Sequence, residues 1–201
     1  MRRVSFSSLQ ITLLKALIHI SCLGTALWFY YQATLDNLGG DPVEEILHFT
    51  GISTLNMLLL SLAMSPLAKA LRQAQFIRFR RLLGLYAFFF AVLHLGSYIL
   101  FELQLEWSML LSEIIERPYI TVGFAAWLIL LTMTLTSTQT IQRKMGKAWQ
   151  KVHNGVYLTA ALIGLHYMWS VKTLTAKPML YLGLLMLALW LRRDKIRRWL
   201  F

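Results

Sequence analysis

Apolar residues in this chain come in six long runs separated by short polar stretches. The runs occupy residues 11–31, 46–64, 82–101, 119–137, 152–171 and 179–191. About 20 helical residues cross the roughly 30 Å hydrocarbon core of a bilayer, and the last run is only marginally long enough. Because hydrocarbon cannot satisfy exposed backbone N–H and C=O groups, each run is predicted to be a helix. The pattern therefore predicts an all-α integral membrane protein, a bundle of six transmembrane helices.

The charged residues predict how these helices are oriented. Sixteen of the twenty Lys and Arg fall in the terminal or connecting segments 2–3, 69–81, 143–151 and 192–198. The alternate loops hold eight of the nine Asp and Glu, all within 36–45 and 102–118. Positively charged loops stay in the cytoplasm, so both chain termini are predicted to be cytoplasmic. The net charge of +11 is then a topology signal, and no nucleic-acid partner is expected.

Several other features narrow the class of protein. The one cysteine, Cys22, excludes an intrachain disulfide and a cysteine-held iron–sulfur cluster. The first run lacks a small-residue cleavage site and is interpreted as an uncleaved span.

Residues 102–118 are amphipathic and predict a short helix in the outer interface. A lipid anchor is favoured there over a docking site. The basic loop 66–81 is expected to lie against anionic membrane lipid. No internal repeat is evident, and residues 1–201 are expected to form a single domain.

Two histidines fall at matching depths in runs predicted to be parallel. His94 lies 12 residues after the start of the third run, and His166 lies 14 residues after the start of the fifth. Their depths agree within about 3 Å at helical rise. Imidazoles at equal depth on neighbouring helices suit the two axial positions of a haem iron. The alternative is that both are core histidines bonded to nearby backbone.

The remaining histidines have no such partner. His153 lies about 20 Å along the helix from His166, too far to share one iron and suitable for a second, inner site. At its depth, just before the third run, the chain has Arg80 and Arg81 instead of a histidine. Arg80 is either an unusual ligand or, with Arg81, an inside-positive charge or a partner for haem propionates. The alternative is that His153 is an interfacial residue. His48, at the outer edge of the second run, and His19, in the first run, are not expected to be ligands.

Six stretches of the chain resemble the MsrQ (YedZ) family of ferric-reductase-like membrane proteins. They are DPVEEILHFTG (41–51), RFRRLLGLYAF (78–88), LH (93–94), RPYITVGF (117–124), LTSTQTIQRKMGKAWQKVHNGVYL (135–158) and HYMWSVK (166–172). The resemblance implies a haem-binding transmembrane domain related to that of the NADPH oxidases, which hold two haems between paired histidines. His94, His153 and His166 match that pattern, and Arg80 stands where the oxidases have a histidine. One or two b-type haems are therefore expected.

The same resemblance implies a role in electron transfer. The family's partner is a soluble periplasmic molybdopterin enzyme that reduces methionine sulfoxide in oxidised proteins. This chain would take electrons from the quinol pool or from a cytosolic flavin reductase, in the bacterial inner membrane, and deliver them outward through haem. The family is also described as binding FMN, although no motif here locates it. No catalytic residues are evident, and the chain is expected to be an electron-transfer subunit whose catalytic reductase is a separate chain.

Two other functions are compatible with parts of the pattern. A stand-alone ferric reductase would use the same haem ligands, but the chain has no attached flavin or nicotinamide domain. A haem-free transporter would use the histidines as proton relays, and the lack of Asp and Glu within the runs argues against it.

Overall fold

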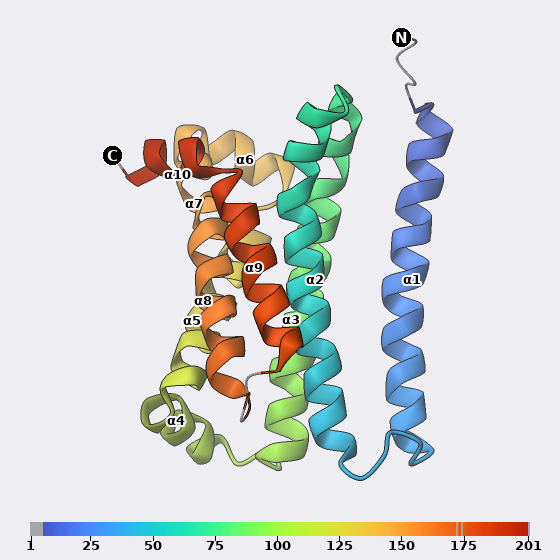
Figure 1. Cartoon of the computed structure of the whole chain (residues 1–201), viewed down its shortest axis with the longest axis vertical. Coiled ribbons are helices and arrows are strands. Elements are labelled where there is room, and N and C mark those ends of the chain that lie inside the picture. The colour runs from blue at the N-terminus through green and yellow to red at the C-terminus, as the bar shows by residue number, and fades with distance from the viewer. Residues whose placement is uncertain (1–5, 172, 174, 201) are drawn as a thin grey trace. The chain divides into compact units, whose positions relative to one another are not determined.

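The structure, a computed structural model, describes residues 6–171, 173 and 175–200, and all regular elements among these are helices (Figure 1). Four helical segments are long and apolar enough to cross a membrane. They are α1 (Ser8–Thr34), α2 (Pro42–Ala70), the segment Ala74–Glu102 and α5 (Pro118–Leu135). The predicted all-α membrane protein is confirmed by these segments. The chain divides into two compact units, Met1–Glu106 and Trp107–Phe201. The expectation of a single domain stays a prediction.

The first unit is built around a helical hairpin. After α1 and α2, the chain passes through the 3₁₀ helix η1 (Ala74–Phe79) into α3 (Arg80–Ser97), which ends in the π-helical turn η2 (Tyr98–Glu102). Helices α2 and α3 pack against each other, and the best-buried side chains of the unit lie on them. These include Leu55, Leu58, Ala87 and Phe90. The hairpin is the rigid part of this unit, because apolar side chains pack along both of its helices.

Polar residues extend the first two helices beyond their apolar runs. Ser7 and Gln10 form a reciprocal capping box at the start of α1. At the start of α2, the Asp41 carboxylate accepts a hydrogen bond from the backbone N–H of Glu44 at 2.9 Å, and Pro42 occupies the first turn. Such caps satisfy backbone donors that have no partner inside the helix. Helix α2 therefore begins four residues before the apolar run that predicted it.

Helix α1 is attached to the hairpin by aromatic contacts. The rings of Phe29 and Phe49 stack with their centroids 4.1 Å apart. The His19 ring meets Tyr86 of α3, with 2.6 Å between His19 Nδ1 and the Tyr86 hydroxyl oxygen. Tyr86 is buried, whereas most of α1 is exposed. We interpret His19 as a residue that holds α1 against α3.

The second unit has three longer helices with short ones at their ends (Figure 1). The elements are α4 (Trp107–Glu116), α5, α6 (Gln139–Met145), α7 (Lys147–His153), α8 (Gly155–Ser170), α9 (Ala176–Trp190) and α10 (Arg193–Leu200). Helix α8 packs against both α5 and α9. Helix α4 lies near one end of this group, and α6, α7 and α10 gather at the other (Figure 1).

The last two predicted spans are shorter than expected. Helices α8 and α9 have 16 and 15 residues, so each is about 23 Å long against a hydrocarbon core of roughly 30 Å. The fifth run, predicted from residue 152, is divided because α7 ends at His153 and α8 begins at Gly155. Asn and Gly are both poor helix formers, which explains a break at Asn154 and Gly155. Four spans are supported by length, and the six-span count stays a prediction.

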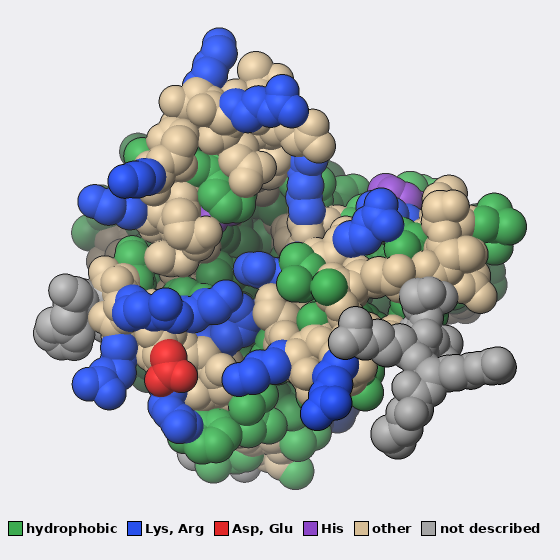
Figure 2. Space-filling model, turned by 90° about the horizontal axis from the view of Figure 1, so that it is seen from above, with side chains coloured by type: hydrophobic (Ala, Val, Ile, Leu, Met, Phe, Trp, Pro, Cys, Tyr) green, Lys and Arg blue, Asp and Glu red, His purple; other side chains and the backbone are tan. Residues whose placement is uncertain are grey.

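Two features predicted for the loops are present in the structure. Helix α4 lies within the acidic loop 102–118, with Trp107, Leu111 and Ile115 exposed at helical spacing. Among the side chains seen in Figure 2, Lys and Arg are common and Asp and Glu are scarce. Arg2, Arg3 and Lys172, which also enter the charge pattern, lie outside the described residues.

The contact between His19 and Tyr86 predicts a small loss of stability in Tyr86→Phe. Hydrogen bonds between membrane helices contribute about 0.5–1.5 kcal/mol, so the free energy of unfolding should fall by that amount. Titration with denaturing detergent in mixed micelles measures it. Tyr31→Phe, which changes an exposed tyrosine of α1, is the matched control. Equal stability of both variants would contradict a role for the His19 contact.

Candidate functional site

His94 of α3 is held by the backbone of α2. Its Nδ1 lies 3.0 Å from the carbonyl oxygen of Leu47. A carbonyl oxygen only accepts hydrogen bonds, so Nδ1 must carry the proton. The Thr50 hydroxyl oxygen lies 3.3 Å from the same nitrogen, and its own hydrogen points to the Ile46 carbonyl at 2.7 Å. In this tautomer the lone pair of the ring is on Nε2, the arrangement found in histidines that bind a metal through Nε2.

His166 of α8 is held in the same way by α5. Its Nδ1 lies 2.7 Å from the carbonyl oxygen of Tyr119, and the Tyr119 ring stacks at 6.1 Å between centroids. The ring is half-buried, as is that of His94. By the same reasoning Nδ1 carries the proton and the lone pair is on Nε2. Both units thus present a histidine with the same tautomer within an apolar helix.

A glycine lies beneath each of these imidazole rings. A Cβ atom added at Gly51 would be 3.3 Å from His94 Cε1 and 3.4 Å from Nδ1. A Cβ atom added at Gly123 would be 2.6 Å from His166 Nδ1 and 2.9 Å from Cε1. The second contact is closer than real Cβ atoms approach, so the His166 ring occupies space that only glycine leaves.

His153 has different surroundings. It ends α7, stacks on Trp149 at 4.0 Å between centroids, and places Nε2 3.1 Å from the Thr136 hydroxyl oxygen. The Thr136 hydroxyl hydrogen is directed at the Thr132 carbonyl at 2.7 Å, so His153 Nε2 must be the donor. The lone pair is then on Nδ1. His153 would bind iron through Nε2 only after this contact with Thr136 is broken.

The structure also gives the local setting of the other predicted residues. Arg80 is the first residue of α3, half-buried, and its carbonyl oxygen accepts a hydrogen bond from the Ser61 hydroxyl at 3.0 Å. His48 is on the exposed side of α2. Arg80 and His94 belong to the first unit, and His153 and His166 belong to the second. Within its own unit, His94 contacts Leu47, His166 contacts Tyr119, and His153 contacts Thr136.

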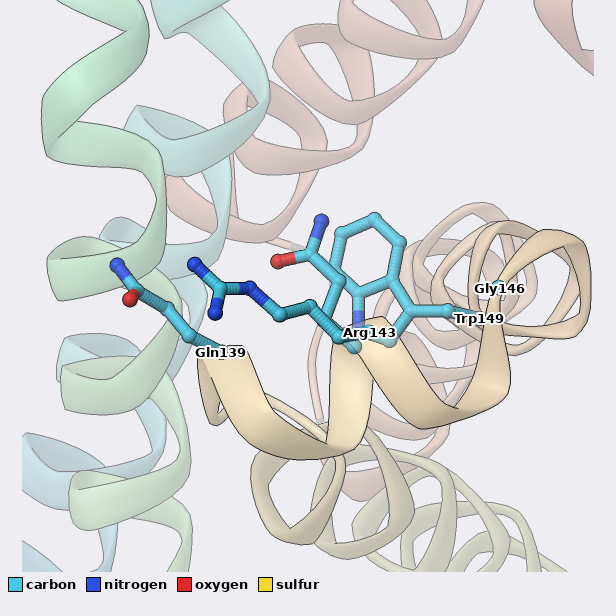
Figure 3. A pocket seen from close by; sticks show the side chains of 5 residues that line it. Gln139, Arg143, Gly146 and Trp149 are labelled. Carbon is cyan, nitrogen blue, oxygen red and sulfur yellow. The ribbon is translucent and has the colours of Figure 1, made fainter.

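A shallow pocket of about 490 Å³ lies beside α6 and α7 in the second unit. It is lined by Gln139, Gln142, Arg143, Gly146 and Trp149. Figure 3 shows the side chains of Gln139 and Arg143 extending from α6 to the same side, away from the indole of Trp149. The indole N–H donates to the Thr136 carbonyl at 3.0 Å, which fixes the Trp149 ring between this pocket and the His153 contact. Cationic, amide and aromatic groups thus meet in one place.

The glycines and carbonyls around the two histidines did not stand out in the sequence. One signal for them exists, because the spacing is repeated. In the first unit the carbonyl residue and the glycine precede the histidine by 47 and 43 positions (Leu47, Gly51, His94), and the second unit has the same two spacings. The chain therefore repeats the spacing of these three positions, although the residues between them are not similar.

Comparison with known proteins identifies the family of this chain. Residues 48–164 match the family described as "Ferric reductase like transmembrane component". The chain is 49% identical over 191 residues to "Protein-methionine-sulfoxide reductase heme-binding subunit MsrQ" of Salmonella paratyphi B, and equally to that of Salmonella newport. Each alignment covers 94% of this chain and 96% of the relative. No solved structure matches the chain. The chain belongs to the ferric-reductase-like transmembrane family and to the MsrQ family.

Proposed function

We propose that this chain is the haem b membrane subunit of a methionine sulfoxide reductase system and carries electrons outward across the bacterial inner membrane. The observation that carries the proposal is the pair of matching histidine settings in apolar helices, at His94 and His166. The relatives from Salmonella, named as heme-binding subunits of this system, support it over nearly the whole chain.

Each of the two histidine settings, taken by itself, fits an axial ligand of haem. Each Nδ1–H donates to a backbone carbonyl, at Leu47 and at Tyr119, which fixes ring orientation and makes Nε2 the basic nitrogen. His94 and His166 would hold the iron of the outer haem. When bound, haem supplies an iron that accepts and releases one electron at a time. The protein's own part is to hold the two rings and to surround the porphyrin with apolar side chains.

The proposed inner site has one histidine, whereas the proposed outer site has two. His153, with Arg80 as its opposite ligand or close neighbour, would hold a second haem nearer the cytoplasm. A protonated guanidinium has no lone pair for a metal, so Arg80 is better suited to a propionate than to iron. Stacking of His153 on Trp149 supports a fixed ring here. The contact of Nε2 with Thr136 means that binding iron through that atom requires a local change.

Electrons would enter from quinol or from a cytosolic flavin reductase. FMN, implied by the family resemblance, would find a cation and an aromatic ring at the pocket of Arg143 and Trp149. The alternation of basic and acidic segments along the chain supports cytoplasmic termini. Six spans require that α8 and α9, which have 16 and 15 residues, also cross the membrane.

Electrons would leave to a periplasmic molybdopterin enzyme that reduces methionine sulfoxide. In the described residues no group of three or more His, Cys, Asp and Glu side chains is placed to hold a metal ion. This chain would pass on electrons, and the molybdopterin enzyme would reduce methionine sulfoxide. A stand-alone ferric reductase and a haem-free transporter are the rival functions that an experiment must separate.

The function predicts a specific sequence of redox events in the purified protein. In nanodiscs, the protein should show a Soret band that shifts when menadiol is added. Adding the periplasmic molybdopterin reductase with methionine sulfoxide should reoxidise the haem, whereas methionine alone should not. Reoxidation by ferric citrate without that enzyme would favour the ferric reductase. Absence of a Soret band would favour the transporter.

Replacing either proposed outer ligand should remove its haem. His94→Ala and His166→Ala should each lose most of the low-spin signal in reduced-minus-oxidised spectra, because one axial nitrogen is missing. His48→Ala and His19→Ala are the controls and should keep spectra like that of the unmodified protein. Membrane insertion is checked by size-exclusion chromatography of a fluorescent fusion. An unchanged spectrum in His166→Ala would rule out this ligand pair.

The inner site predicts a different pattern of loss. His153→Ala and Arg80→Ala should each lose about half of the haem if two haems of b type are bound. Reduction by a cytosolic flavin reductase should slow more than reduction by menadiol, because the inner haem is the nearer acceptor. Lys151→Ala, at an exposed position of α7, is the control. If both variants keep all their haem and both reduction rates, there is no inner haem at these residues.

A further inference from the structure

The two histidine settings are built on the same plan. In each, one helix contributes a carbonyl and, four residues later, a glycine, and the next long apolar helix of the unit contributes the imidazole. The residues are Leu47, Gly51 and His94 in the first unit, and Tyr119, Gly123 and His166 in the second. We use the term histidine seat for the carbonyl residue and the glycine of each set.

Helix geometry explains why the second residue of a seat is glycine. A helical carbonyl points along the axis toward the N–H of the residue four positions later. Its oxygen has a second lone pair, so it accepts a further hydrogen bond from a side chain at the helix surface. A ring that reaches this oxygen must lie over the residue four positions later. A Cβ atom there would meet the ring, and glycine has none.

We propose that Gly51 and Gly123 are positioning residues for the axial ligands of the haem. Their role is to let each imidazole lie close enough to the helix for Nδ1–H to bond to the carbonyl of Leu47 or Tyr119. This bond sets the direction in which Nε2 points. The proposal rests on the proposed function, because it assigns a role toward a haem that His94 and His166 would hold.

An added Cβ atom would come closer to the imidazole at Gly123 than at Gly51, so alanine should have different effects at the two positions. At Gly123 an added Cβ atom would lie 2.6, 2.9 and 3.1 Å from Nδ1, Cε1 and Cγ of His166, so the whole ring would have to move. At Gly51 the nearest distances to His94 are 3.3 and 3.4 Å, which a shift of a few tenths of an ångström would relieve. Alanine should therefore be far more damaging at Gly123 than at Gly51.

The chain supplies matched glycines without such neighbours. Gly96 in α3 and Gly183 in α9 have no other atom within 4 Å of an added Cβ. Alanine is a better helix former than glycine by about 1 kcal/mol, so all four substitutions should favour their helices. A loss confined to Gly123 would then come from the displaced imidazole and not from a weakened helix.

The test compares Gly123→Ala, Gly51→Ala, Gly96→Ala and Gly183→Ala in the full-length protein purified in detergent. Haem content is measured by the pyridine haemochrome method, ligand geometry by low-spin EPR g-values, and insertion by size-exclusion chromatography. Loss of a group that orients a metal ligand weakens metal binding by about 10–100-fold, so Gly123→Ala should lose most of its low-spin haem on dilution into haem-free detergent. Gly51→Ala should keep its haem with shifted g-values, and the controls should match the unmodified protein.

Several outcomes would overturn the proposal. Haem content and g-values of Gly123→Ala identical to those of the unmodified protein would do so, as would equal losses in Gly183→Ala. If Gly123→Ala does not insert, Gly51→Ala decides, and unchanged g-values there count against the proposal. An unmodified protein without haem would instead refute the proposed function, so the two failures are distinguishable.

Discussion

The hydrogen bond from an imidazole Nδ1–H to a helix carbonyl is the interaction on which the candidate site depends. Inside a membrane, a histidine ring must satisfy its polar atoms from the protein, because lipid tails offer no partners. At His94 and His166 a carbonyl oxygen of the neighbouring helix accepts a hydrogen bond from Nδ1–H. That one contact orients the ring, selects the tautomer and requires close approach of two helices. Glycines at the contact make that approach possible.

The hydrogen-bond partner of the ring also distinguishes His153 from the other two histidines. Its Nε2 faces the Thr136 hydroxyl, whose hydrogen is directed to the Thr132 carbonyl, so Nε2 carries the ring proton. A histidine that binds iron through Nε2 would carry its proton on Nδ1 instead. Trp149 connects this histidine to the pocket beside α6 and α7. The surroundings of His153 are thus polar and aromatic, whereas His94 and His166, the proposed outer ligands, lie in apolar helices.

Hydrophobic packing gives the histidine seats their rigidity. In the first unit, Leu55, Leu58 and Phe90 are almost fully buried on α2 and α3, the two helices that form the seat of His94. In the second, Ala160 and Ala126 are buried on α8 and α5, which form the seat of His166. Small side chains there allow the helices to approach closely, as is common in membrane helix pairs. Close packing and ligand orientation are therefore produced by the same helix contacts.

Much of this protein is determined by the sequence alone, because the bilayer permits few backbone structures. The apolar runs determined the class and the approximate helix positions, and alternating charge indicated an orientation. Histidine depth along the runs singled out His94 and His166. Tertiary structure decided what periodicity does not encode: the break at Asn154, the contact of His153 with Thr136, and the carbonyl and glycine that hold each ring. These depend on which atoms of two distant segments meet, and Gly51 and Gly123 look like any other helix glycine until the imidazole lies over them.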